Sequence, residues 1–511
     1  MWARFYKQDL RVIAHYLGSL LVLFSVAMLV PLLVSLLFGE WAVSVRYVFG
    51  VGMTLTAGSA LRLAKISPAQ MERKQAIAIT ALAWMVCAFF AAVPLSLSGH
   101  FQSPFDAYFE SVSALTATGI SMLGDIDHLS VADNMWRFTM QFLGGQGVVV
   151  VALSLGIFTR TGNSLYNTEG REESVLPSIK KTTQFIWRVS SGVVIIGTIV
   201  LFIIFMFSGI EPLRSFFHGL WITIGAYNTG GFASQSLSLI YYHSWPLEVI
   251  VMVLMCLGAI NFALMARIHH GNWREMLSDI EIRTLATWIT VMVLLLVAAL
   301  MAGDFLTDFS GLMRRGIFTI VSASTNTGYD LLSPNQTTSM LTSGAFFLIA
   351  ISMAVGGSAG STAGGIKALR VGIIFKGIVA RVKSVLLPPS AQITTTYNHI
   401  GKHTLTGDIL SSALIIAALY VTTYLLGSLV GIAFGYGALP ATFESISVTS
   451  NAGLSSGIAV PGAPLLLKII YILQMWMGRL EFLTLLALFA SLIASITPRA
   501  RVKAFVRRRR G

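Results

Sequence analysis

Ten stretches of this sequence are apolar over close to the length that crosses a lipid bilayer, and no other feature restricts the fold as strongly. A crossing helix needs about 20 mainly apolar residues. With 55% of its 511 residues hydrophobic and 11% charged, the chain exceeds what a soluble core can bury. The sequence therefore predicts an all-α integral membrane protein with ten spanning helices. They lie near residues 12–38, 42–62, 75–97, 135–159, 185–208, 246–267, 284–303, 342–381, 408–436 and 464–496.

Basic residues are distributed unevenly between the two sides of this topology. An even number of crossings places both termini on one side, together with about 28 of the 35 lysines and arginines. Loops rich in lysine and arginine stay in the cytoplasm, so both termini are predicted to be cytoplasmic. The same rule accounts for the net charge of +13 without a nucleic-acid partner, and the arginines at 507–510 are expected near anionic lipid headgroups. Six basic residues fall outside: Arg46, Arg137, Arg214, Arg314, Arg315 and Lys468.

Four external segments repeat one pattern of thirteen residues, at 107–119, 219–231, 316–328 and 441–453. Each begins with a small residue, has an aromatic residue two places later, and closes on a glycine preceded three places earlier by a polar residue. A further glycine follows 25 to 28 residues later, in the next predicted helix, as Gly144, Gly258, Gly356 and Gly478. Each copy thus predicts a helix, a half-helix, a turn and a second helix. Two crossings per copy make the repeats parallel, able to close as a pseudo-fourfold ring around a central pore.

A half-helix followed by extended, glycine-containing backbone is the arrangement that aims carbonyl oxygens at a dehydrated cation. One such copy alone could be a surface turn or a capped re-entrant loop, but four in register favour a selectivity filter. Hydroxyl groups of the threonines and the serine could assist the carbonyls. The predicted filter residues are Thr116, Ala117, Thr118, Gly119, Asn228, Thr229, Gly230, Gly231, Thr325, Asn326, Thr327, Gly328, Ser450, Asn451, Ala452 and Gly453.

The segment 356–365 contains five glycines, Gly356, Gly357, Gly360, Gly364 and Gly365, inside the second helix of the third repeat. Such a run cannot continue a stable helix, and a broken helix within a membrane must line a cavity. A flexible cytoplasmic linker is the alternative. A phosphate-binding loop is excluded because Lys367 falls one place late and Ala368 follows it. We expect a mobile gating loop beneath the filter.

Arg479 is predicted near the middle of the last helix, where a charge is costly and usually faces a pore, a cavity or a partner. Glu481 would point to another face, so the alternative of a structural ion pair needs a partner elsewhere in the bundle. A positive charge below a cation filter would raise the barrier to conduction, with the glycine loop packed against it. Cys87 and Cys256 lie in apolar segments, and the histidines show no ligand spacing.

The chain resembles the Trk/Ktr/HKT superfamily of potassium transporters from about residue 11 to 498, and within it the bacterial Trk-type pore subunit. The helix pair at 12–62 favours the Trk branch. The resemblance is carried by the fourfold pattern and by the segments Gly356–Lys367, Leu143–Gly147, Leu257–Phe262 and Met477–Glu481.

This resemblance implies potassium uptake through a channel-like pore in the bacterial inner membrane, with K+ bound at the sixteen filter residues and Rb+ accepted. It implies a homodimer, and a gate formed by residues 356–365 and Arg479. A cytoplasmic ring of RCK/TrkA-like regulatory subunits would bind nucleotide and open that gate, and no covalently bound cofactor is expected.

The predicted organisation is an N-terminal hairpin at 1–68, pore repeats at 69–165, 166–275, 276–400 and 401–498, and a basic tail at 499–511. The alternative function is an ion-coupled secondary carrier, because discontinuous helices and internal repeats also build cation symporters. Coupling would usually need intramembrane carboxylates, and this chain has few. Glu110 and Glu444 lie on the half-helices, where helix-terminal or structural roles are expected. An enzyme would need a cluster of nucleophile, acid and base, and the sequence offers none.

Overall fold

The computed structural model describes residues 4–66, 71–147, 150, 153, 179–269, 271, 273–302, 309–331, 341–388 and 394–496. Within these ranges the chain is mostly helical, with two short two-stranded sheets. An N-terminal hairpin precedes four groups of helices that share one order, as the sequence predicts: a long helix, a short helix and a second helix. The predicted basic tail at 499–511 lies outside the described residues.

The N-terminal hairpin consists of α1 (Lys7–Ala27), α2 (Leu29–Leu37) and α3 (Trp41–Arg62). Small residues allow its two arms to approach closely, as in other membrane helix pairs. A Cβ atom placed on Gly18 would lie 2.6 Å from the carbonyl oxygen of Gly58, and one on Gly58 would lie 2.9 Å from that of Gly18. The two glycines therefore fix where α1 crosses α3.

The four repeats follow in chain order. The first contains α4 (Arg73–Ser96), α5 (Pro104–Leu115) and α6 (Val131–Gln146). The second contains α9 (Ile179–Phe207), α10 (Pro212–Tyr227), the short 3-10 helix η1 (Ser238–Tyr242), α11 (Trp245–Gly258), α12 (Phe262–His269) and α13 (Trp273–Ser278). The short helices α5 and α10 end immediately before the predicted filter residues.

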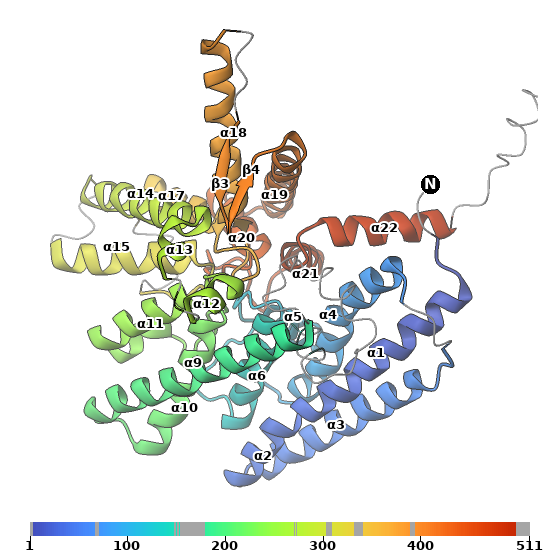
Figure 1. Ribbon diagram of the computed structural model, residues 1–511. Helices are drawn as coiled ribbons and strands as arrows, with labels where there is room; N and C mark the ends of the chain where they lie inside the picture. Colours follow the sequence, from blue (N-terminus) through green and yellow to red (C-terminus); the bar gives the residue numbers. More distant parts are fainter. Residues whose placement is uncertain are drawn as a thin grey trace, which may run out of the picture.

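The third repeat contains α14 (Ile280–Ala302), α15 (Phe309–Ser324), α17 (Ser343–Ala354), the strand pair β1 (Val355–Gly356) and β2 (Ile366–Lys367), and α18 (Ala368–Leu386). A hairpin of β3 (Thr396–Asn398) and β4 (Lys402–Thr404) leads into the fourth repeat, and α18 projects together with this hairpin from one face of the molecule (Figure 1). The fourth repeat contains α19 (Gly407–Ala433), α20 (Ala438–Thr449), α21 (Leu465–Arg479) and α22 (Leu483–Ile496).

Among the described residues, five helices are long and apolar enough to cross a membrane, and two bent helix pairs raise the number to seven if each counts as one span. The five are Lys7–Leu37, Arg73–Ser96, Lys180–Phe207, Ile280–Met301 and Gly407–Ala433, and the pairs are α11 with α12 and α21 with α22. The remaining three of the ten predicted segments coincide with α3, with α6 and with α17 followed by α18. Every predicted segment thus contains at least one helix where the structure describes it.

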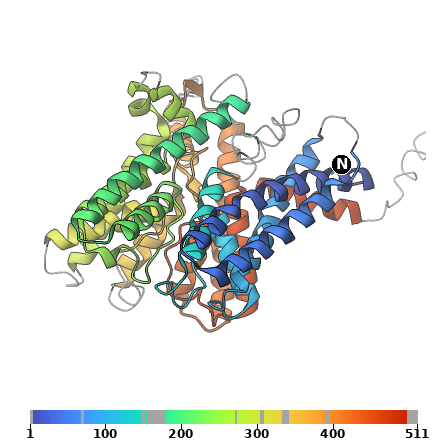
Figure 2. The same ribbon diagram turned by 90° about the horizontal axis from the view of Figure 1, so that it is seen from below.

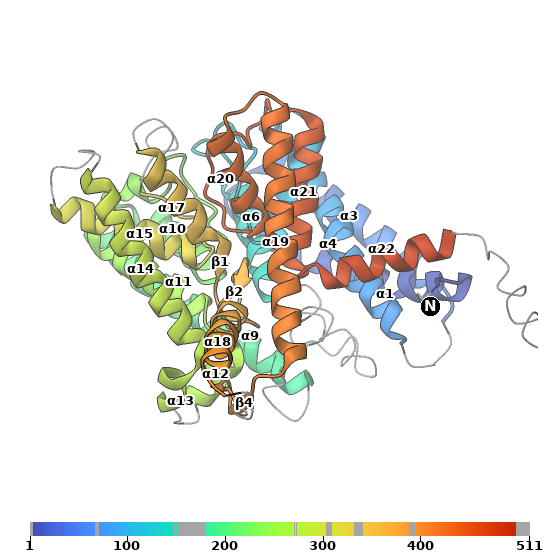
Figure 3. The ribbon, with the colours of Figure 1, turned by 90° about the horizontal axis from the view of Figure 1, so that it is seen from above.

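The helices are grouped around a centre close to the strand pair of the third repeat. In Figure 3, β1 and β2 lie between α1, α3, α4 and α22 on one side and α10, α11, α14, α15 and α17 on the other. Figure 2 shows the same division from below, with the blue hairpin beside the first repeat and the green and yellow helices opposite. The first and last helices meet, since the backbone N–H of Phe5 donates to Ser495 Oγ at 2.8 Å.

The second long helix of every repeat is interrupted near its glycine, whereas the sequence predicted such a break only in the third. Helix α6 ends at Gln146, before Gly147 with a φ of 87°. The bend between α11 and α12 is 103°, and that between α21 and α22 is 114°. At the last break the left-handed residues are not glycines, since Glu481 and Phe482 adopt φ values of 55° and 59°.

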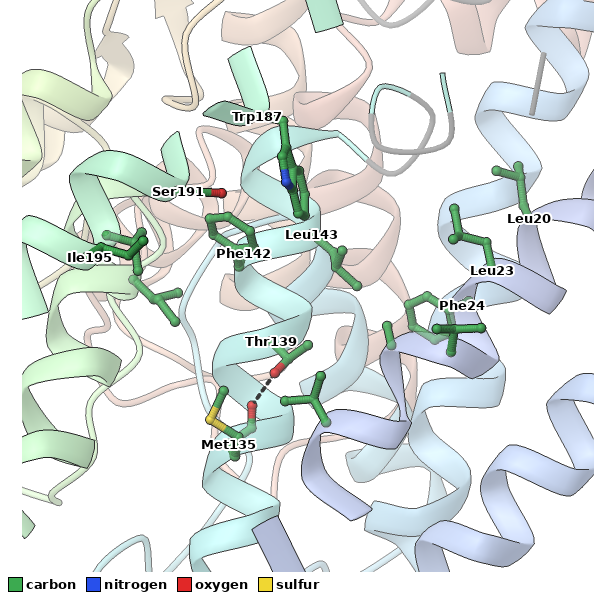
Figure 4. A pocket seen from close by; sticks show the side chains of 15 residues that line it. Leu20, Leu23, Phe24, Met135, Thr139, Phe142, Leu143, Trp187, Ser191 and Ile195 are labelled. Carbon is green, nitrogen blue, oxygen red and sulfur yellow. Dashed lines mark hydrogen bonds between the residues drawn. The ribbon is translucent and has the colours of Figure 1, made fainter. Parts of the chain in front are cut away.

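A pocket of about 450 Å3 lies between α1, α6 and α9, away from the filter segments (Figure 4). Its walls are aliphatic and aromatic, with Phe24, Phe142 and Trp187 among them. The hydroxyl of Thr139 is turned back to the carbonyl of Met135 at 2.7 Å. Among the described residues that line it, Thr139 and Ser191 are polar and none is charged, so this lining is a poor match for a dehydrated cation.

Candidate functional site

The four predicted filter segments share one backbone conformation. Their second residues have positive φ, at 54° for Ala117, 47° for Thr229, 53° for Asn326 and 52° for Asn451. Their closing glycines also have positive φ, at 88° for Gly119, 63° for Gly231, 89° for Gly328 and 86° for Gly453. Non-glycine residues adopt this region rarely and at a cost of order 1–3 kcal/mol each, so the surrounding structure must impose it. The repetition in sequence is therefore a repetition of backbone geometry.

The closing glycines form a closed ring through contacts between consecutive repeats. A Cβ atom on Gly119 would strike the carbonyl oxygen of Gly230, one on Gly231 that of Thr327, one on Gly328 that of Ala452 and one on Gly453 that of Thr118. All four of these separations are well under 3.0 Å, which is closer than Cβ atoms approach other atoms in proteins. The order of contacts runs from the first repeat to the fourth and returns to the first. Four backbone carbonyls thus lie in one ring that only glycine permits.

A second set of glycines seats three of the broken helices on the short helices. Cβ atoms on Gly144, Gly258 and Gly478 would strike the carbonyl oxygens of Leu115, Tyr227 and Thr449, respectively. Those carbonyls belong to the last residues of α5, α10 and α20. The third repeat differs, because Gly356 meets the carbonyl of Gly364 and the side chain of Asn326 instead. In the third repeat the glycine loop therefore contacts this glycine, whereas in the other three repeats the end of the short helix contacts it.

Hydroxyl groups of the first and third predicted filter segments brace the backbone. Thr116 donates to the carbonyl of Val112 at 2.8 Å and lies 2.8 Å from the hydroxyl of Thr118. Thr325 and Thr327 repeat this arrangement, also at 2.8 Å. Hydroxyl hydrogen bonds within the segment hold it in shape and leave the backbone carbonyls as the groups that face one another.

Asparagine side chains tie two filter segments to the neighbouring helices. Asn326 Nδ2 donates to the carbonyl of Met353 at 2.8 Å, and Asn451 Nδ2 donates to that of Met475 at 3.0 Å. Asn451 also donates to Thr118 Oγ1 at 2.8 Å, which joins the fourth segment to the first. These buried amides thus link α17 and α21 to the predicted filter segments.

The two carboxylates considered for ion coupling have structural partners. Glu110 accepts the backbone N–H of Met122 at 2.7 Å and the Nε of Arg137 at 2.8 Å. Glu444 accepts the backbone N–H groups of Ser456 at 2.6 Å and Ala459 at 3.2 Å. Each carboxylate thus anchors the chain that leaves the filter to the short helix that enters it. This bonding favours the structural role expected from the sequence over a role in ion coupling.

The segment 356–365 forms a compact loop below the filter, closed at its base by the parallel pair β1 and β2. Thr362 is its central anchor, because its hydroxyl donates to the carbonyl of Gly258 at 2.8 Å and accepts from Thr229 Oγ1 at 3.1 Å. The backbone N–H of Ser358 donates to the carbonyl of Ala259 at 2.9 Å. The loop is thus bonded to the second filter segment and to the break between α11 and α12.

Arg479 is the last residue of α21, and the prediction that it lies in mid-helix is wrong. The left-handed residues Glu481 and Phe482 end the helix there and turn the chain. Its guanidinium donates to the carbonyl of Thr362 at 2.7 Å and to that of Gly144 at 2.6 Å. Arg479 therefore contacts the glycine loop, as predicted.

A cavity of about 30 Å3 lies between the loop and this arginine. Its lining includes Trp84, Gly147, Lys367, Arg479 and Glu481. A space of this size holds one or two water molecules at most. Glu481 pairs with Arg370, so the cavity floor carries more positive than negative side chains. The space between the glycine loop and Arg479 is therefore small and electropositive.

The chain resembles transport proteins over nearly its whole length. Residues 46–496 match the model of the TrkH family, described as cation transport protein. The chain is 30% identical over 492 residues to the uncharacterized cation transporter MJ1485 of Methanocaldococcus jannaschii, covering 96% of this chain and 97% of that protein. It is 30% identical over 502 residues to the Trk system potassium uptake protein TrkH of Halomonas elongata, covering 94% and 98%.

The fold matches the crystal structure of the potassium transporter TrkH from Vibrio parahaemolyticus with a TM-score of 0.80 at 25% identity, covering 96% of this chain and 98% of that one. The resemblance drawn from the filter pattern and the glycine loop is thereby confirmed. The chain belongs to the TrkH family of cation transport proteins.

Proposed function

We propose that the chain takes up potassium through a pore on the axis of the four repeats. The observation that carries this proposal is the closed ring of contacts between the closing glycines and the carbonyls of Gly230, Thr327, Ala452 and Thr118. A ring of backbone carbonyls replaces the hydration shell of a cation such as K+. The names of relatives that act in potassium uptake support the same ion.

The short helices add to the attraction for a cation. Helices α5, α10, α15 and α20 end at Leu115, Tyr227, Ser324 and Thr449, directly before the filter segments. The carbonyl end of a helix carries a partial negative charge. Four such ends beside one ring attract a monovalent cation. The filter therefore needs no acidic side chain to bind it.

The glycine loop and Arg479 are proposed to form the gate. Gly356, Gly357, Gly360, Gly364 and Gly365 give this loop the freedom to move, and two of them already have positive φ, at 65° for Gly360 and 67° for Gly365. The guanidinium adds a positive charge under the filter. Opening requires that the hydrogen bond between Arg479 and Thr362 breaks and that the loop moves aside.

Regulation and assembly follow from the family resemblance. We propose a homodimer in the bacterial inner membrane, with both termini cytoplasmic. The bond between Phe5 and Ser495 supports termini on a common side. A cytoplasmic RCK/TrkA-like subunit that binds nucleotide would act on the face from which α18 and the β3–β4 hairpin project.

Uptake of Rb+ by cells that lack their own potassium transporters tests this proposal. Cells expressing the chain are expected to accumulate Rb+ and to grow at low external K+, whereas the Gly231→Asp variant should do neither. Reconstituted protein then distinguishes a pore from a symporter. A pore gives Rb+ flux that follows the Rb+ gradient alone, and flux that requires a proton or sodium gradient would favour the carrier.

A further inference from the structure

Three metal-ligating side chains converge away from the pore, on the face where the β3–β4 hairpin projects. Asp279 precedes α14, Glu281 lies in its first turn and His399 lies in the turn between β3 and β4. Each offers one ligand atom, and these atoms lie within 4.8 Å of one another. The three side chains are 2%, 0% and 7% exposed. Sequence reasoning missed the cluster because its histidine is more than a hundred residues from its acids.

The burial of two carboxylates at one place requires positive charge, because isolated buried charges are costly. His399 Nδ1 lies 3.2 Å from Asp279 Oδ2 and 3.9 Å from Glu281 Oε2. Lys367 interacts electrostatically with Glu281, but its ammonium group is bonded to the carbonyl of Ala363. Arg267 donates to the carbonyl of Ile400 and pairs with Glu275. The three side chains thus place one imidazole nitrogen and two carboxylate oxygens close enough for a single dication to bind all three.

One imidazole nitrogen and two carboxylate oxygens are a ligand set suited to a divalent transition metal. Mg2+ and Ca2+ prefer oxygen ligands alone. His399 Nδ1, the ring nitrogen nearest the two carboxylates, would be the metal ligand. Imidazole together with carboxylates therefore favours Zn2+ over Mg2+ at this position.

The cluster is bonded directly to the gating loop. Glu281 Oε1 accepts the backbone N–H of Ala359 at 2.7 Å. The hairpin that carries His399 is held to α18 by Lys376, whose Nζ donates to the carbonyl of Thr396 at 2.7 Å. An ion that binds Glu281 thus acts on the same carboxylate that holds the loop, and it also fixes the hairpin relative to α14.

We propose that Asp279, Glu281 and His399 form a binding site for a divalent transition-metal ion, and that its occupancy stabilises the gating loop in the closed position. Metal binding at this site does not depend on the proposed function. The effect of binding on flux does rest on the proposed function, so metal binding and flux are measured separately.

The first experiment titrates the purified full-length protein, stripped of metal with a chelator, with Zn2+ alone by calorimetry. We expect one ion per chain, and affinity at least tenfold lower for His399→Gln and for Asp279→Asn. His403→Gln is the matched control, because His403 lies on the same hairpin but is exposed and stacks on Tyr397. Wild-type protein that binds no Zn2+, or binding that His399→Gln leaves unchanged, overturns the site.

A spectrum of the Co2+-loaded wild-type protein keeps the test valid if the variants do not fold. Absorption bands of a Co2+ ion with imidazole and carboxylate ligands are expected at one equivalent, and a spectrum identical to that of Co2+ in buffer overturns the site.

The second experiment measures Rb+ flux from liposomes with Zn2+ on the hairpin side. Flux is expected to fall severalfold in wild-type protein and in His403→Gln, but not in His399→Gln. Equal flux with and without bound Zn2+ overturns the coupling to the loop.

Discussion

Arg479 donates a hydrogen bond to the carbonyl oxygen of Thr362 at 2.7 Å, and so connects the end of α21 to the centre of the glycine loop. The same guanidinium reaches the carbonyl of Gly144 in α6 at 2.6 Å. One side chain therefore joins the fourth, third and first repeats beneath the filter. Its ring contact with Trp84, 5.5 Å from the guanidinium carbon, adds α4 to the same junction.

Replacement of Arg479 by Ala should increase Rb+ flux in the absence of any regulatory subunit. A hydrogen bond to a charged group contributes about 1.5–3 kcal/mol, so the loss of one that exists only in the closed state shifts the equilibrium toward opening by tenfold or more. Flux from proteoliposomes measures the effect. Arg479→Lys is the control, because it keeps the charge but reaches one carbonyl, and its flux should be intermediate. Reduced flux through correctly assembled Arg479→Ala protein would contradict the gate.

The hydroxyl of Thr362 should contribute as much to the function of the gating loop as the glycines of the loop do. Thr362→Val removes the bonds to the carbonyl of Gly258 and to Thr229 while keeping the shape of the side chain. The loop should loosen, and unregulated Rb+ flux should rise severalfold. Thr362→Ser keeps the hydroxyl and should behave like the wild-type protein. If Val and Ser variants show the same flux, the loop is held by its backbone alone.

The four-part architecture and the positions of the four repeated glycine segments could be predicted because their signals are local in the sequence. Each copy carries its own glycine and its own polar residue at a fixed spacing, and the glycine loop is long enough to exclude a helix. The cyclic contact of Gly453 with Thr118 could not be predicted, because it depends on how repeats far apart in sequence close around an axis. The break after Arg479 was missed because its left-handed residues are not glycines.

The basic residues on the predicted external side show the same limit. The sequence analysis only counted them on that side and assigned them no partners. In the structure Arg137 pairs with Glu110, Arg46 pairs with Asp133 at 2.9 Å, and Lys468 pairs with Asp106. Helical periodicity gives no sign of such pairs, because their partners lie on other helices.

Serine at the closing glycines should reduce discrimination between K+ and Na+. The added Cβ atom at Gly453 would strike the carbonyl of Thr118 and displace it from the ring. Gly457→Ser is a matched control, because Gly457 has a φ of 85° against 86° for Gly453 and has no atom within 4 Å of its Cβ position. Serine therefore strains the backbone similarly at the two positions, but only at 453 does its Cβ atom collide with another atom. We expect the ratio of Rb+ to Na+ uptake to fall in Gly453→Ser and to stay unchanged in Gly457→Ser. Unchanged ratios for serine at 119, 231, 328 and 453 would contradict the filter assignment.

Arg137→Met should destabilise the protein and disturb the second filter segment. Arg137 and Glu110 are both fully buried and bond at 2.8 Å, and removal of one partner leaves a buried charge at a cost of about 3–5 kcal/mol. Arg137 also donates to the carbonyl of Ala233 at 3.2 Å and lies 4.3 Å from the ring centre of Phe232, directly after Gly231.

The double variant Arg137→Met/Glu110→Gln separates these two effects. Glutamine removes the uncompensated charge and can still accept the N–H of Met122, so the unfolding temperature of the detergent-solubilised protein should recover in part. The bond to Ala233 stays lost, so the ratio of Rb+ to Na+ uptake should remain reduced in both variants. If selectivity recovers together with stability, Arg137 acts on the filter only through its charge balance with Glu110.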